Sequence, residues 1–68
     1  MMSPRVRGGL RNRLRRTVER LGGLTATSER TGLAREEVLA CVGYRQQRPS
    51  DAQLRLLAIR LASAGVAA

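Results

Sequence analysis

Arginine side chains are the main candidates for binding a partner in this sequence. The 68 residues contain 13 cationic side chains, all arginine, against five acidic ones, which gives a formal charge of +8 at pH 7. Guanidinium groups bind phosphate and carboxylate oxygens through paired, charge-assisted hydrogen bonds. Seven of the arginines fall within residues 1–20. This uneven distribution favours a basic N-terminal surface that binds a polyanion, the alternative being an ordinary solvated helix face.

Groups suited to catalysis or metal binding are scarce. The sequence has no histidine and a single cysteine, Cys41, so it has neither the usual zinc ligands nor a cysteine–histidine nucleophile pair. The glycine pairs at 8–9 and 22–23 match no phosphate-binding loop motif. We therefore expect no catalytic residue, no metal and no cofactor, and we interpret the chain as a binding module and not an enzyme. Cys41 is expected to be a small core residue.

The sequence also indicates in which cellular compartment the protein is expected. One cysteine permits no disulfide within the chain, whereas small secreted domains normally need several. The N-terminal residues lack the apolar run of a secretory signal, and no apolar stretch approaches the roughly 20 residues of a membrane span. We therefore expect a cytoplasmic, nucleoid-associated protein without membrane contact.

The first helix is predicted from apolar residues at spacings of four, four, four and three. These residues are Val6, Leu10, Leu14, Val18 and Leu21. One stripe of this kind is typical of an amphipathic helix. Glycines favour irregular backbone, so the pair at 8–9 predicts that the regular helix begins near Leu10 and leaves residues 1–9 as a flexible basic arm. The pair at 22–23 ends the helix.

Two short helices are predicted next, joined by a turn at Gly32. The first runs from about Ala26 to Thr31 and is capped by the side chain of Thr25. The second runs from about Ala34 to Val42. Its inward residues are Val38, Cys41 and Val42, with Leu33 filling the gap at the turn. Two helices that meet at about a right angle across a glycine turn form a helix-turn-helix unit.

The closing helix is predicted from a capping box, in which Ser50 and Gln53 satisfy each other's backbone N–H groups. Its buried stripe consists of Leu54, Leu57, Ala58, Leu61 and Ala62. Leu56 and Ile59 lie off that stripe. They are either a contact with another subunit or isolated surface residues. Residues 63–68 are predicted to fray as a C-terminal tail.

The central and C-terminal segments resemble the Cro/CI-like (Xre-like) helix-turn-helix regulators of phages and prophages. In a 20-residue frame that begins at Leu24, the expected small residue is Ser28, the turn glycine is Gly32, and the apolar positions ten, fifteen and eighteen are Leu33, Val38 and Cys41. The stretch from Arg45 to Ala62 resembles the loop and closing helix of the family. The chain departs from the family at Ala34, where a capping Ser or Thr is usual.

The resemblance implies an all-α, lambda-repressor-like bundle of four to five short helices over residues 10–62. It implies binding of double-stranded DNA, occupation of an operator as a transcriptional repressor or activator, and a homodimer that matches a palindromic site. The predicted DNA-binding residues come from the motif, from the arginines of the predicted arm and from the loop after the second helix of the motif. They are Arg5, Arg7, Thr25, Arg35, Glu36, Leu39, Ala40, Tyr44, Arg45, Gln46, Gln47 and Arg48.

A second interpretation is that the same scaffold binds another protein. Glu36, Glu37 and Leu39 stand in the predicted reading helix, where polar or basic residues are commoner in the family. This pattern favours a small basic interaction module whose partner is RNA polymerase or a larger DNA-binding regulator, as a phage-type inhibitor or accessory factor would be. The strongly basic composition opposes it.

Overall fold

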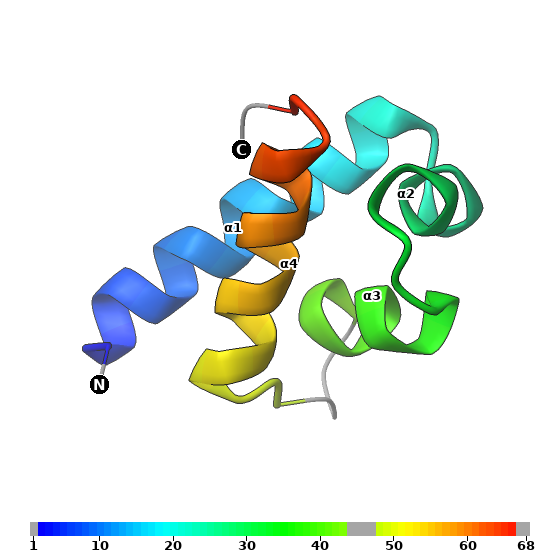
Figure 1. The fold of residues 1–68 in the computed structure, drawn as a ribbon. Coiled ribbons are helices and arrows are strands. Elements are labelled where there is room, and N and C mark those ends of the chain that lie inside the picture. The colour runs from blue at the N-terminus through cyan, green and yellow to red at the C-terminus, as the bar shows by residue number, and fades with distance from the viewer. Residues whose placement is uncertain (1, 44–47, 67–68) are drawn as a thin grey trace.

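The protein is an all-α bundle of short helices. A computed structural model describes residues 2–43 and 48–66 and shows four helices there, α1 (Pro4–Leu21), α2 (Leu24–Thr31), α3 (Arg35–Val42) and α4 (Asp51–Ser63). Each helix contacts the other three. Figure 1 shows α4 crossing α1, with α2 and α3 together beside them. The predicted fold class is confirmed.

The core is built from aliphatic side chains of three helices and the turn before α3. Its buried hydrophobic residues are Leu14, Val18, Leu33, Val38, Cys41, Val42, Leu54, Leu57 and Leu61. These include the inward residues predicted for the second helix of the motif. Two stripe residues are outside the core: Val6 of α1 is 55% exposed, and Ala62 of α4 is exposed. Both lie near a helix end, where fewer neighbouring elements cover a side chain.

The start of α1 differs from the prediction, because the expected arm is helical from Pro4 onward. The Ser3 hydroxyl accepts a hydrogen bond from the Val6 N–H at 3.3 Å, and a proline in the first turn has no N–H to leave unsatisfied. Asp51 of α4 also holds this end: it accepts from the Met2 N–H at 3.2 Å. These contacts outweigh the cost of two interior glycines, roughly 1 kcal/mol each.

The turn between α2 and α3 contains Gly32, as predicted. Gly32 closes α2 in the left-handed region with φ 76°, and its N–H donates to the Ser28 carbonyl. The Ser28 hydroxyl donates to the Leu33 carbonyl at 2.6 Å, so a polar side chain helps to hold the turn. Figure 1 shows α2 almost along its axis while α3 runs across the view, so the chain changes direction sharply here.

The predicted side-chain cap at Thr25 is wrong. α2 begins one residue earlier, at Leu24, with Gly23 as the N-cap and no side-chain cap bond. Leu24 packs against the core, which draws it into the helix and places Thr25 in the first turn. At α3, the N-cap residue Ala34 also makes no side-chain cap bond.

A pair of glycine substitutions tests the turn. Gly32→Ala is expected to lower the free energy of unfolding by about 1 kcal/mol, because a Cβ is disfavoured at positive φ. Gly9→Ala, inside α1, is expected to raise it by about 0.5–1 kcal/mol through helix propensity, since an added Cβ there meets nothing within 4 Å. Urea denaturation of both variants measures the two shifts. Shifts of the same sign would contradict this account of the turn.

Both ends of α4 are stabilised by hydrogen bonds. The predicted capping box is present: the Gln53 N–H donates to the Ser50 hydroxyl at 3.1 Å, and the Ser50 N–H donates to the Gln53 side chain at 2.8 Å. The predicted fraying after Ala62 does not extend through the described tail, because Val66 donates its N–H to the Leu61 carbonyl at 2.9 Å and packs against the core. As predicted, Leu56 and Ile59 are exposed, at 40% and 61%.

Within residues 2–43 and 48–66, none of the helices combines the length and the apolarity that crossing a bilayer requires.

Candidate nucleic-acid interface

α3 presents a charged face on the side opposite the core. Its buried residues Val38, Cys41 and Val42 lie on one side of the helix, so the 3.6-residue periodicity turns Glu36 and Ala40 outward. Arg35 and Glu36 are exposed, and Leu39 and Ala40 are half-buried. The four side chains that were expected to contact bases therefore come from one helix, and its charged first turn is open to a partner.

The starts of α2 and α3 lack capping side chains. Neither α2 nor α3 has a side-chain cap, so the N–H groups of their first turns are not satisfied by a capping side chain. Thr25 is exposed in the first turn of α2. Such N–H groups and hydroxyls are suited to phosphate oxygens, which also interact favourably with the positive end of the helix dipole.

Two of the predicted arginines meet at a surface hollow beside the end of α3. Arg7 and Arg48 both line it, together with Arg11 of α1 and Asp51 of α4. Arg7 forms an ion pair with Asp51 at 3.6 Å, and Arg11 donates to the carbonyl of Gly43, the C-cap of α3. The hollow therefore brings three arginines together, and Arg11 connects it to the end of α3.

The remaining predicted site residues do not gather at this face. Arg5 is exposed on α1, so it is part of a helix and not of a free arm that reaches into a groove. Tyr44, Arg45, Gln46 and Gln47 lie outside the described residues.

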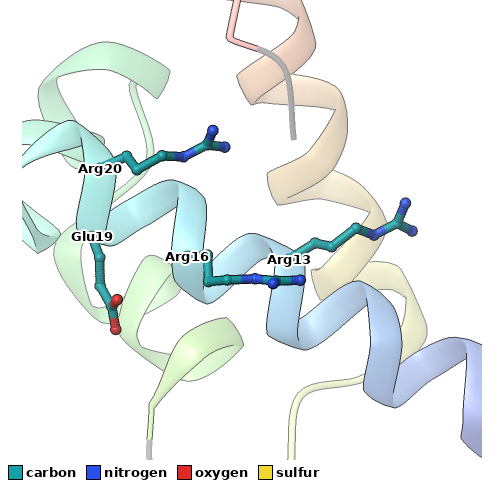
Figure 2. Close-up of a pocket in the computed structure, with 4 residues that line it drawn as sticks. All are labelled: Arg13, Arg16, Glu19 and Arg20. Atoms are coloured by element: carbon teal, nitrogen blue, oxygen red, sulfur yellow. The ribbon is translucent and has the colours of Figure 1, made fainter.

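The charge of the molecule is concentrated on α1. This helix carries seven arginines against one glutamate, whereas residues 24–42 carry Arg30 and Arg35 against Glu29, Glu36 and Glu37. Figure 2 shows the outer surface of α1, where Arg13, Arg16, Glu19 and Arg20 line an open hollow. The sequence prediction omitted this cluster, although the spacing of its arginines, three and then four residues, places them on one helix face.

Cys41 is part of the core, as predicted, and its thiol is not placed for reaction. It is 2% exposed, and its Sγ lies 3.3 Å from the Gln53 carbonyl, to which the thiol donates. Burial raises the pKa of the Cys41 thiol above its ordinary value; the Glu37 carboxylate adds to the rise and Arg11 opposes it. A buried thiol that keeps its proton is a poor nucleophile.

The raised pKa of Cys41 predicts a pH dependence of stability. The folded state holds the thiol proton more tightly than the unfolded state, so the stabilisation is present below the unfolded-state pKa and is lost as pH rises through the higher folded-state value. The free energy of unfolding should therefore fall between about pH 7 and pH 10, and fall less in Cys41→Ala. Urea denaturation under reducing conditions measures both. An equal fall in the two proteins would contradict the prediction.

Comparison with known proteins gives no relative. No family model matches the sequence, and no curated protein or solved structure matches the chain.

Proposed function

We propose that the protein is a sequence-specific regulator of transcription that binds double-stranded DNA with α3 in the major groove. The observation that carries this proposal is the sharp turn at Gly32, which projects the exposed first turn of α3 from a bundle of charge +8. A helix fits the major groove, where side chains distinguish all four base pairs. Arg35 is suited to pair with guanine and Glu36 to accept from the amine of cytosine.

Phosphate contacts would supply most of the affinity. The basic hollow lined by Arg7, Arg11 and Arg48 lies beside the end of α3, so it is suited to the DNA strand that flanks the groove. The uncapped start of α2, with the exposed Thr25, is suited to a phosphate of the same duplex. Operator occupancy in the nucleoid, by a homodimer, is the mode of action that these contacts would serve.

An electrophoretic mobility shift measured against salt tests the proposal. The labelled duplex should be retained, and its affinity should fall about tenfold or more between about 50 and 200 mM salt, because each neutralised phosphate releases counterions. The proposal fails if no duplex is retained at the lower salt concentration.

A second candidate function is binding to another protein, such as RNA polymerase or a larger DNA-binding regulator. Exposed Glu36 and Glu37 on α3, and exposed Leu56 and Ile59 on α4, favour it. Leu56 and Ile59 are equally suited to a symmetric contact between two copies. Sedimentation of the protein with and without duplex separates these cases: a dimer on DNA supports regulation, whereas a stoichiometric complex with a protein partner and no bound duplex supports the second function.

A further inference from the structure

The outer face of α1 carries a row of arginines that the proposed DNA contact does not use. We define the arginine ridge as Arg5, Arg13, Arg16 and Arg20, all of which are exposed. At a rise of 1.5 Å per residue, the ridge extends roughly 22 Å along the helix. In Figure 2 the guanidinium groups of Arg13, Arg16 and Arg20 extend in the same general direction along α1.

Little nearby charge compensates the ridge. In the part of the chain that the structure describes, the guanidinium groups of Arg5, Arg13 and Arg16 make no ion pair or hydrogen bond. Glu19 lines the same hollow, but its carboxylate points away from the three guanidinium groups in Figure 2. Arg5, Arg13 and Arg16 are therefore the open cations of the ridge, whereas Arg20 donates a hydrogen bond to the Thr17 hydroxyl at 3.1 Å.

The ridge faces away from α3. Arg11 bonds the carbonyl of Gly43 and so marks the side of α1 that faces α3. By the 3.6-residue periodicity, Arg13, Arg16 and Arg20 stand about 140–200° around α1 from Arg11. α3 in turn buries Val38 and its neighbours in the core and directs its exposed face outward. The ridge and the exposed face of α3 are thus separate surfaces of the bundle, since one is turned away from the end of α3 and the other away from the core.

We propose that the arginine ridge is a second, sequence-independent binding surface for the phosphate backbone of duplex DNA, so that the protein bridges two duplexes. This inference rests on the proposed function, which places the first duplex against α3. Guanidinium groups bind phosphates by paired hydrogen bonds, and a straight row of them on a helix follows a strand without entering a groove.

Two features distinguish a DNA backbone from other polyanionic partners. A helix that lies on a membrane must present an apolar face to the lipid, whereas the apolar residues Leu14 and Val18 of α1 are buried in the core. Binding of single strands relies on aromatic side chains that stack on bases, and the whole sequence contains one aromatic residue. Duplex DNA is the polyanion that remains for a nucleic-acid-binding protein.

A bridging assay tests the ridge. One duplex, with a sequence recovered by selection from a random library, is immobilised on beads, and a second labelled duplex of scrambled sequence is added with the full-length protein. Wild-type protein should stay on the beads and capture the labelled duplex. Arg13→Gln/Arg16→Gln should stay on the beads with at most a small loss but capture at least tenfold less, because two phosphate contacts to the second duplex are lost.

The matched control is Arg55→Gln/Arg60→Gln, which removes the same charge from exposed positions of α4 and should capture as wild type does. Circular dichroism confirms that both variants are folded. The proposal is overturned if the ridge variant captures normally, if neither protein captures, or if the ridge variant leaves the beads, which would put the ridge in the first interface. It is also overturned if labelled double-stranded RNA or anionic vesicles are captured in place of DNA. Failure of wild-type protein to bind the beads contradicts the proposed function itself.

Discussion

Leu57→Ala is expected to lower the free energy of unfolding by about 2–5 kcal/mol. Leu57 is fully buried among the side chains of α4 and the other core helices, so truncation removes apolar contacts and leaves a cavity. A domain of this length has a total stability of only about 3–10 kcal/mol. The variant should therefore lose a large part of its stability and unfold at a lower temperature and urea concentration than the wild type, which circular dichroism during urea and thermal denaturation measures.

Leu56→Ala is the matched control, because it removes the same atoms from the neighbouring residue. Leu56 is 40% exposed, and surface truncations usually change stability by no more than about 0.5 kcal/mol. Measuring both variants at two protein concentrations separates any contribution from a contact between subunits. Similar losses in the two variants would contradict the assignment of the core.

Arg35→Ala is expected to cost about 1–3 kcal/mol of binding to a duplex recovered by selection, and much less with a scrambled duplex. The reason is that a bidentate pair with guanine forms at one sequence only. Arg35 is exposed in the first turn of α3, so its removal should leave the fold intact. Mobility-shift titrations with the two duplexes measure the difference.

Arg13→Ala provides the comparison for this experiment. Arg13 is an exposed arginine of α1 on the side away from α3, and its removal should weaken binding slightly and to the same extent with both duplexes. If Arg35→Ala and Arg13→Ala had equal effects on cognate and scrambled DNA, α3 would not be the helix that reads the sequence.

Local pattern was enough to predict most of the fold. The apolar spacing of α3, the glycine turn at Gly32 and the capping box at Ser50 depend on residues within a few positions of one another, and all three are confirmed. The start of α1 was missed although Ser3 and Pro4 form a local helix-start pattern, because the glycine pair at 8–9 was given more weight and because Asp51, which binds the Met2 N–H, is 49 residues away. Contacts of that separation leave no trace in local periodicity.

Some residues of the candidate site could likewise be predicted from local sequence, whereas others depend on how the helices pack. Glu36 is exposed because the periodicity of α3 turns it away from the buried residues Val38 and Val42. Arg35 lies on the same side as those residues and is exposed at the first position of the helix. Arg7 and Arg48 line the same hollow only because α1 packs against the start of α4, which no local pattern reveals. The arginine ridge was present in the spacing of Arg13, Arg16 and Arg20, but a helix predicted to begin at residue 10 excluded Arg5 from it.

The most direct test of the account is a titration of isotope-labelled protein with one equivalent of the selected duplex, followed by nuclear magnetic resonance of the backbone amides. The proposed function predicts that the largest chemical-shift changes fall on Arg35, Glu36 and Ala40, with smaller changes along the outer face of α1. If the amides of α3 kept their positions while the largest changes fell on α1 or α4, the claim that α3 reads DNA would be contradicted.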